Sequence, residues 1–205
     1  NLPAEELCVL RSLLAQVLAL RGRTERAQAE IELAGQLEQS APSQLARIQL
    51  AIARATLASA QGPVDQACDE LEMAYELASE SGDLLAILQL AVPLVDALVK
   101  DGRATRARKV IASAERLAKR HSVQVVEKQI RLAQHYLGAA YRGEREGMEA
   151  LRAALDEAIV EGIPSAVLRA SEFLAEALER QGDRGAAERT HAIALDVRRS
   201  RGYAV

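Results

Sequence analysis

The stretch Asp101-Gly102-Arg103-Ala104-Thr105-Arg106-Ala107 continues through Ile111 and Ala114. It predicts a tight turn followed by a helix. The chain repeats this pattern, with turn glycines separated by 40, 40, 41 and 39 residues: Gly22, Gly62, Gly102, Gly143 and Gly182. Five, nine and twelve residues after the glycine, most repeats place a small, a larger and again a small residue, as in Ala27, Ile31 and Ala34. Self-similarity at a fixed period of this length is the signature of a solenoid.

The composition favours one extended helical domain. The 205 residues are 49% hydrophobic but only 2% aromatic, without tryptophan, which suits closely packed helices. A net charge of −3 gives no global attraction to nucleic acid or anionic lipid. The chain begins at Asn1 without a charged-then-apolar leader and contains no long apolar run. We therefore expect a fragment of a larger cytoplasmic protein.

Apolar periodicity predicts an all-α fold of ten helices arranged as five antiparallel pairs. The expected repeats of this single domain, 1–205, cover about 4–40, 43–81, 83–121, 122–162 and 163–201. Thr24, Ser43 and Asp83 are the expected N-caps, and Pro93 is expected to kink its helix.

The small–large–small pattern after each glycine resembles the second helix of the tetratricopeptide repeat. Leu14-Ala15, Leu94-Val95 and Leu174-Ala175 match that family's large–small pair in the first helix, whereas Arg54-Ala55 and His135-Tyr136 depart from it. The period of about 40 is similar to that of kinesin light chains and of the helical sensor regions of large bacterial LuxR-type ATPase regulators. The resemblance implies a right-handed α-solenoid and a role in protein–protein interaction within signalling or transcription regulation.

The sequence offers little that would support catalysis. His121, His135 and His191 are scattered over three repeats, without the spacing of metal ligands or of a nucleophile and its base. Cys8 and Cys68 are expected to be buried free thiols. We therefore expect no enzyme activity, no cofactor and no bound metal.

Charge alternates between successive second helices. Range 64–80 carries six acidic and no basic residues, whereas 103–120 carries seven basic residues and Glu115. A nucleic-acid patch is one interpretation of the basic helix, but few aromatic residues are available to stack on bases. We favour complementarity between neighbouring repeats and expect no direct contact with nucleic acid.

In tetratricopeptide arrays the first helices line a concave binding surface. Aligning the repeats by glycine places these polar residues at equivalent first-helix positions: Gln16, Gln49, Thr56, Gln89, Asp96, Arg169, Glu172 and Glu176. The glutamine amides can both donate to and accept from a peptide backbone. The Lys and Asn of the family's clamp for chaperone carboxylate tails are missing.

We expect a scaffold or sensor module that binds a protein or peptide. The alternative is a small-molecule effector domain, with an apolar cavity near Val92, Pro93 and Leu137.

The first helix is apolar on more than one side. One ridge can pack on the following helices; the two ridges consist of Leu7, Leu10, Leu14, Val17 and Leu18, and of Val9, Leu13 and Leu20. The other ridge has nothing in this chain to cover it, and we assign this role to Val9, Leu13 and Leu20. We expect this ridge to contact either upstream repeats or a second copy of the chain.

Overall fold

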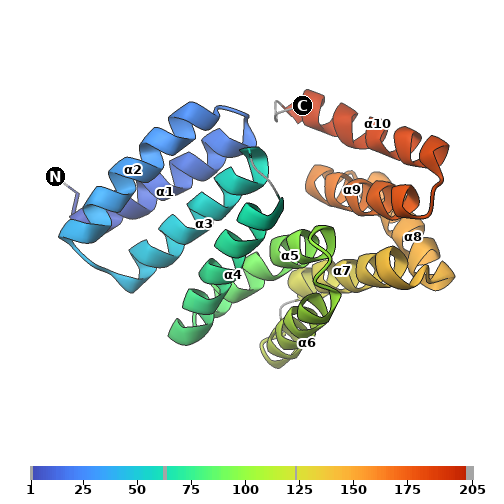
Figure 1. Ribbon diagram of the computed structural model, residues 1–205, viewed down its shortest axis with the longest axis horizontal. Coiled ribbons are helices and arrows are strands. Elements are labelled where there is room, and N and C mark those ends of the chain that lie inside the picture. The colour runs from blue at the N-terminus through green and yellow to red at the C-terminus, as the bar shows by residue number, and fades with distance from the viewer. Residues whose placement is uncertain (1, 62–63, 123, 202–205) are drawn as a thin grey trace. The chain divides into compact units, whose positions relative to one another are not determined.

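The computed structural model describes residues 2–61, 64–122 and 124–201, and these contain ten α-helices and no strand (Figure 1). The helices are α1 (Ala4–Leu20), α2 (Thr24–Ser40), α3 (Gln44–Gln61), α4 (Val64–Ser81), α5 (Leu84–Lys100), α6 (Ala104–Arg120), α7 (Gln124–Arg142), α8 (Arg145–Glu161), α9 (Pro164–Arg180) and α10 (Arg184–Arg201). The all-helical prediction is confirmed. Among the described residues, no helix combines the length and the apolar character that crossing a membrane requires.

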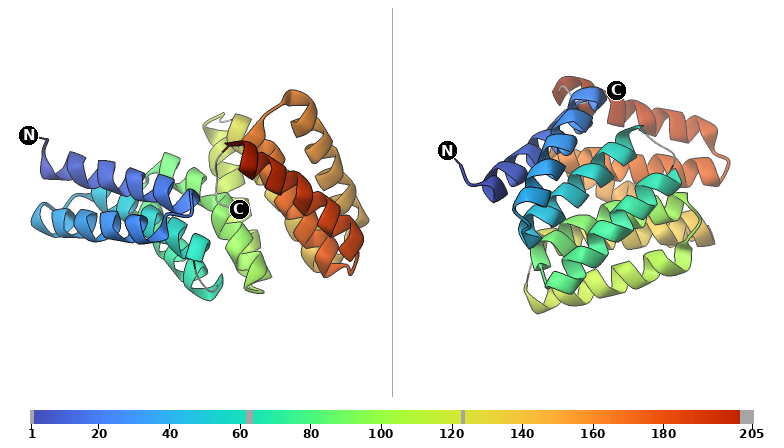
Figure 2. Two further views of the ribbon diagram at one scale, coloured as in Figure 1. Left: turned by 90° about the horizontal axis from the view of Figure 1, so that it is seen from above. Right: turned by 60° about the vertical axis from the view of Figure 1, so that its left-hand side comes forward.

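The helices pack in chain order within two compact units, Asn1–Asp101 and Gly102–Val205. In the first unit α1 lies against both α2 and α3, α3 packs on α4, and α4 packs on α5 (Figures 1 and 2). In the second unit the order is α6 on α7, α7 on α8, α8 on α9 and α9 on α10, with α7 also touching α9. Two pairs of first helices from consecutive expected repeats therefore meet directly, α1 with α3 in the first unit and α7 with α9 in the second. One continuous domain over 1–205 stays a prediction.

The turn glycines adopt the left-handed conformation that only glycine reaches without strain. Gly22 has φ 68°, and Gly102, Gly143 and Gly182 have φ 81°, 60° and 84°. At the first turn the Arg23 N–H donates to the Leu18 carbonyl at 2.9 Å, which closes the end of α1. Gly62 lies outside the described residues.

Side-chain caps start several helices. Asp83 Oδ1 accepts from the Ala86 N–H at 3.0 Å, and Ser43 Oγ accepts from the Ala46 N–H at 3.3 Å, as predicted. The expected cap at Thr24 is wrong, because Thr24 is already the first residue of α2 and Arg23 precedes it without a side-chain cap. α5 runs continuously through Pro93.

The repeated small residues form the centre of the helix contacts. Ala27, Ala34, Ala74, Ala107 and Ala114 are completely buried. The larger residues between them, among them Ile31, Leu71 and Ile111, are also buried. A methyl group is the smallest side chain that still fills space, so these positions allow neighbouring helices to approach closely.

The fourth repeat achieves a close approach with glycine instead. Gly147 of α8 is buried against α7. A methyl group at this position would lie 2.9 Å from the His135 carbonyl oxygen and 3.0 Å from the Ala139 backbone nitrogen. Both of these atoms belong to the backbone of α7, so they cannot move aside as a flexible side chain would.

We expect Gly147→Ala to lower the free energy of unfolding by about 1–3 kcal/mol, because the added methyl group forces α7 and α8 apart. The matched control is Gly185→Ala in α10, where the nearest atom to the added methyl group is Arg189 Nη1 at 3.6 Å. This control should stabilise the chain by about 0.4–1 kcal/mol. Thermal unfolding followed by circular dichroism measures both changes, and equal melting temperatures would contradict the close approach.

Candidate interaction surfaces

Three glutamines occupy the first helices of the first unit. Gln16 of α1 and Gln49 of α3 are half-buried, and Gln89 of α5 is exposed. Within the described part of the chain, none of these three side chains has a hydrogen-bond partner, and the Nε2 atom of Gln16 is itself buried. Gln28 of α2, in contrast, donates to Glu32 at 3.0 Å. The first helices therefore carry amides that the fold itself does not use.

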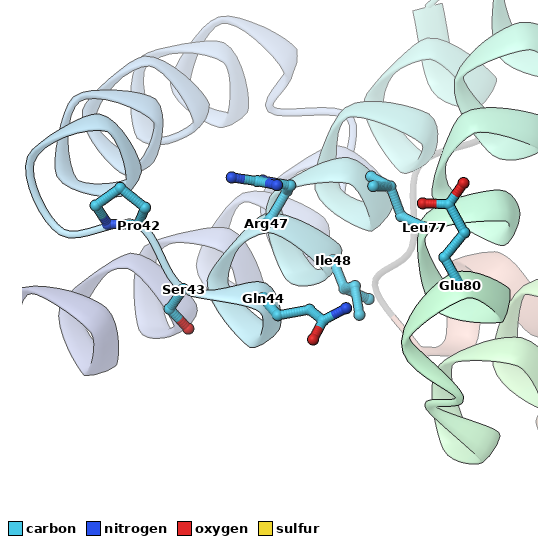
Figure 3. Close-up of a pocket in the computed structure, with 7 residues that line it drawn as sticks. All are labelled: Pro42, Ser43, Gln44, Arg47, Ile48, Leu77 and Glu80. Atoms are coloured by element: carbon cyan, nitrogen blue, oxygen red, sulfur yellow. The ribbon is translucent and has the colours of Figure 1, made fainter.

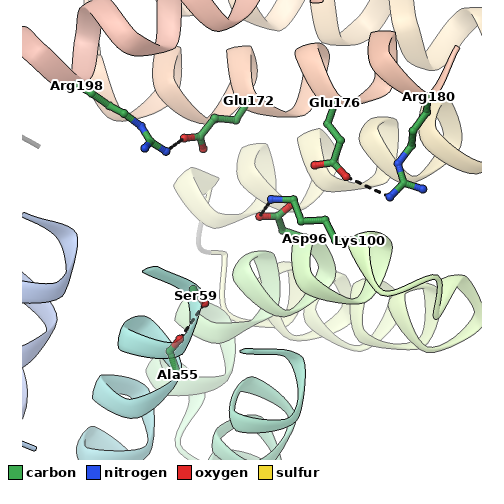
Figure 4. A network of polar contacts seen from close by, with 8 residues as sticks. All are labelled: Ala55, Ser59, Asp96, Lys100, Glu172, Glu176, Arg180 and Arg198. Carbon is green, nitrogen blue, oxygen red and sulfur yellow. Dashed lines mark hydrogen bonds and ion pairs between the residues drawn. The ribbon is translucent and has the colours of Figure 1, made fainter. Parts of the chain in front are cut away.

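The other predicted site residues of the first unit are bonded within their own helices. Thr56 Oγ1 donates to the Ile52 carbonyl at 2.8 Å. Lys100 Nζ lies 3.0 Å from Asp96 Oδ2, one turn away on α5 (Figure 4). Thr56 and Asp96 are half-buried, so both contribute to the surface of the first helices.

The predicted site residues of the second unit lie on α9 and are half-buried. Glu172 pairs with Arg198 of α10, and Glu176 pairs with Arg180 at 3.2 Å (Figure 4). The guanidinium of Arg169 lies 5.7 Å from the centre of the Phe173 ring. The charges on this part of α9 are therefore largely compensated inside the unit, which leaves less for a ligand than their number suggests.

Six of the aligned first-helix positions are buried and belong to the core: Ser12, Ile52, Val92, Ile130, Ala133 and Leu137. Apart from Ser12, the polar members of the alignment reach the surface. The expectation that Gln49 and Gln89 share one groove stays a prediction.

The sequence did not predict the aromatic contact that joins α7 and α9. Tyr136 and Phe173 are buried and stack with ring centroids 4.2 Å apart and planes 6° from parallel. Tyr136 belongs to the His135-Tyr136 pair that departs from the repeat pattern. The departure therefore places a second ring against Phe173, the only phenylalanine in the sequence.

A hollow of about 310 Å³ opens between the start of α3 and the end of α4 (Figure 3). Its apolar lining comes from Pro42, Ile48 and Leu77, and its charged lining from Arg47 and Glu80. Arg47 also pairs with Glu38 of α2 at 3.2 Å. No motif in the sequence pointed to this site, because its residues come from a loop and two separate helices.

Two further hollows lie in the second unit. One of about 340 Å³ is bordered by α8, α9 and α10, with Ile159, Val167 and Ile193 among its apolar residues. Another of about 360 Å³ surrounds the start of α6 and is lined by the basic residues Arg103, Arg106 and Lys109. Val92, Pro93 and Leu137, where the effector alternative expected a cavity, line none of these three hollows.

The titratable groups form no metal cluster within the described residues. His191 pairs with Glu179 at 3.0 Å, and the Cys8 thiol donates to the Ala34 carbonyl at 3.3 Å. Burial raises the pKa of the Cys8 thiol, and Cys68 is also buried. A raised pKa keeps a thiol protonated at neutral pH, where a nucleophilic cysteine would need the thiolate.

A comparison with protein-family models and a comparison with curated proteins both give no match. The resemblance to tetratricopeptide repeats therefore depends on the repeated sequence pattern, with which the observed helix packing is compatible.

We expect both native cysteines to resist Ellman's reagent at pH 8 in the folded protein, because they are buried and the Cys8 thiol is held in its protonated form. Unfolding in guanidinium chloride should release two thiols per chain. Rapid labelling of either cysteine under native conditions would contradict the packing of α1 on α2 or that of α4 in the core.

Proposed function

We propose that this chain is a non-catalytic module that binds a protein or an extended peptide. In this proposal it is a right-handed tetratricopeptide-like solenoid of five antiparallel helix pairs. It acts as scaffold or sensor in a bacterial, cytoplasmic signalling or transcription-regulatory protein. The observation that carries the proposal is the set of three first-helix glutamines, Gln16, Gln49 and Gln89, whose amides have no partner in the described chain.

The chemistry of these amides suits a peptide backbone. An extended peptide presents both N–H donors and carbonyl acceptors, and a primary amide can bind either one. Gln49 is half-buried and Gln89 is exposed, so a ligand main chain can form hydrogen bonds with their amides directly. The helices that carry the amides are already folded, which keeps the ordering cost of binding on the protein side low.

The distribution of charge supports an uncharged main-chain ligand over an ionic one. On α9 the acidic residues Glu172 and Glu176 already have arginine partners. Among the described residues, the amides of Gln49 on α3 and Gln89 on α5 have no charged partner. A ligand therefore gains more from hydrogen bonds to the first unit than from displacing ion pairs in the second.

The second candidate is a small-molecule effector domain, and the hollow in Figure 3 favours it. Arg47 and Glu80 line the same hollow as Ile48 and Leu77, a combination that suits a small zwitterionic ligand with an apolar part. In this case the ligand would contact α3 and α4 through the residues that line this hollow, and these include none of the three glutamines that carry the first proposal.

The test begins with selection of binders from a displayed peptide library, followed by calorimetric titration of the best peptide. We expect Gln49→Ala and Gln89→Ala each to weaken binding by about 3- to 10-fold, the loss of about one net hydrogen bond. The control is Gln36→Ala on α2, an exposed glutamine outside the first helices, which should leave binding unchanged.

Equal affinity of the wild type and the Gln49→Ala/Gln89→Ala double variant would refute the proposed site. Loss of binding in Arg47→Ala, with the glutamine variants unaffected, would instead favour the hollow of Figure 3.

A further inference from the structure

The solvent-facing side of α1 is almost entirely apolar. Leu10, Leu13, Leu14, Val17 and Leu20 are 50%, 44%, 45%, 50% and 54% exposed. Their spacing of three and four residues places them along one face of the helix. The expected division of α1 into two ridges is therefore wrong. Val9 packs partly against the core formed by α1, α2 and α3, whereas Leu10, Leu14 and Val17 are exposed together with Leu13 and Leu20.

The core of the first unit does not use this apolar face of α1. The opposite side of α1 supplies Cys8, Ala15 and Ala19 to the core, and α1 packs there on α2 and α3. Five large side chains that are about half exposed form a patch of roughly 400–500 Å², within the range of about 300–600 Å² found for the largest apolar patch on a monomeric protein. An apolar patch of this size can be assigned to an interaction when the residues at its edges indicate which partner covers it.

The two ends of the apolar stripe carry opposite charges. Glu6 is exposed one turn before Leu10, and Arg21 is exposed directly after Leu20. A second α1 that runs antiparallel would place each Glu6 beside an Arg21 of the other copy, at both ends of the stripe. A parallel copy would place Glu6 beside Glu6 and Arg21 beside Arg21, which is unfavourable.

We propose that two copies of this chain associate through α1 as an antiparallel helix pair. Pairing Glu6 of each copy with Arg21 of the other centres the contact next to Leu14, so Leu10 of one helix lies opposite Val17 of the other and apolar residues face each other along the contact. The opposite end charges are the property that selects a second copy over an unrelated apolar partner. This inference concerns α1 alone and does not depend on the proposed peptide site.

The size of the surface predicts a weak, reversible dimer. Pairing two patches buries roughly 900 Å², below the 1,200–2,000 Å² of a standard stable interface. The contact should therefore form and dissociate with concentration and should leave the fold of each copy unchanged.

Sedimentation equilibrium on the purified chain is the first measurement. We expect a concentration-dependent monomer–dimer equilibrium, lost in Leu13→Glu with an unchanged circular dichroism spectrum. Glu6→Arg and Arg21→Glu, tested singly, should each weaken the dimer by roughly tenfold, since each turns attraction into repulsion. In a mixed dimer, the Glu6→Arg copy carries arginine at positions 6 and 21, and the Arg21→Glu copy carries glutamate at both. Mixing these two variants should therefore restore association.

The matched controls reverse exposed charges elsewhere. Glu146→Arg changes an exposed first-turn glutamate of α8, and Arg152→Glu changes an exposed arginine of the same helix. Both should leave the equilibrium unchanged. A monomer at every concentration, or a mixture of the two α1 variants that associates no better than either alone, would overturn the proposal. Binding to phospholipid vesicles without dimer formation would also overturn it.

Engineered cysteines test the direction of the pair. Two copies of Leu14→Cys meet near the centre of an antiparallel contact and should form a disulfide under mild oxidation. Two copies of Leu20→Cys would be separated by about 18 Å along the axis, at 1.5 Å per residue, and should not. The wild type is the control, because its own cysteines are buried. Faster cross-linking of Leu20→Cys than of Leu14→Cys would refute the antiparallel arrangement.

Discussion

The close contact of helices through small side chains is the constraint on which the rest of this structure depends. Ala27 and Ala34 of α2 are completely buried, and so are Ala107 and Ala114 of α6. Because an alanine keeps the helix surfaces close, each second helix fits against its neighbours, and the first helices α1 and α3 can then touch each other. The fourth repeat meets the same requirement with Gly147, where the α7 backbone leaves no room for a methyl group.

This packing determines which side chains are left for binding. The helices of each unit use alanines and branched apolar residues against one another, so the polar side chains of the first helices are left toward solvent. In the second unit, Glu172 and Arg198 neutralise each other between α9 and α10. In the first unit, Gln49 and Gln89 have no such partner, and α1 adds an apolar stripe that the core does not use. The two units therefore differ in what they offer a ligand, although they are built on the same repeat.

The fold was predictable because its determinants are local and periodic. The left-handed turn at Gly102 and the cap at Asp83 follow from single residues and their neighbours. The cap at Thr24 failed because the turn residue Arg23 already occupies the cap position. The Tyr136–Phe173 stack and the hollow beside Arg47 were not predictable, because each depends on side chains that come together from separate elements. Aligning the repeats identified the polar positions of the first helices. It could not show which of these side chains already have partners within the fold.

The most direct test of the close helix contact is the unfolding free energy of two leucine substitutions on the same helix. Ala34 of α2 is completely buried, whereas Ala29, five residues earlier on the same helix, is exposed. Both variants add the same three carbons, so differences in helix propensity cancel. The account predicts that Ala34→Leu loses about 1–3 kcal/mol relative to Ala29→Leu, since the larger side chain separates α2 from α1 and α3. Equal stability of the two variants would contradict it.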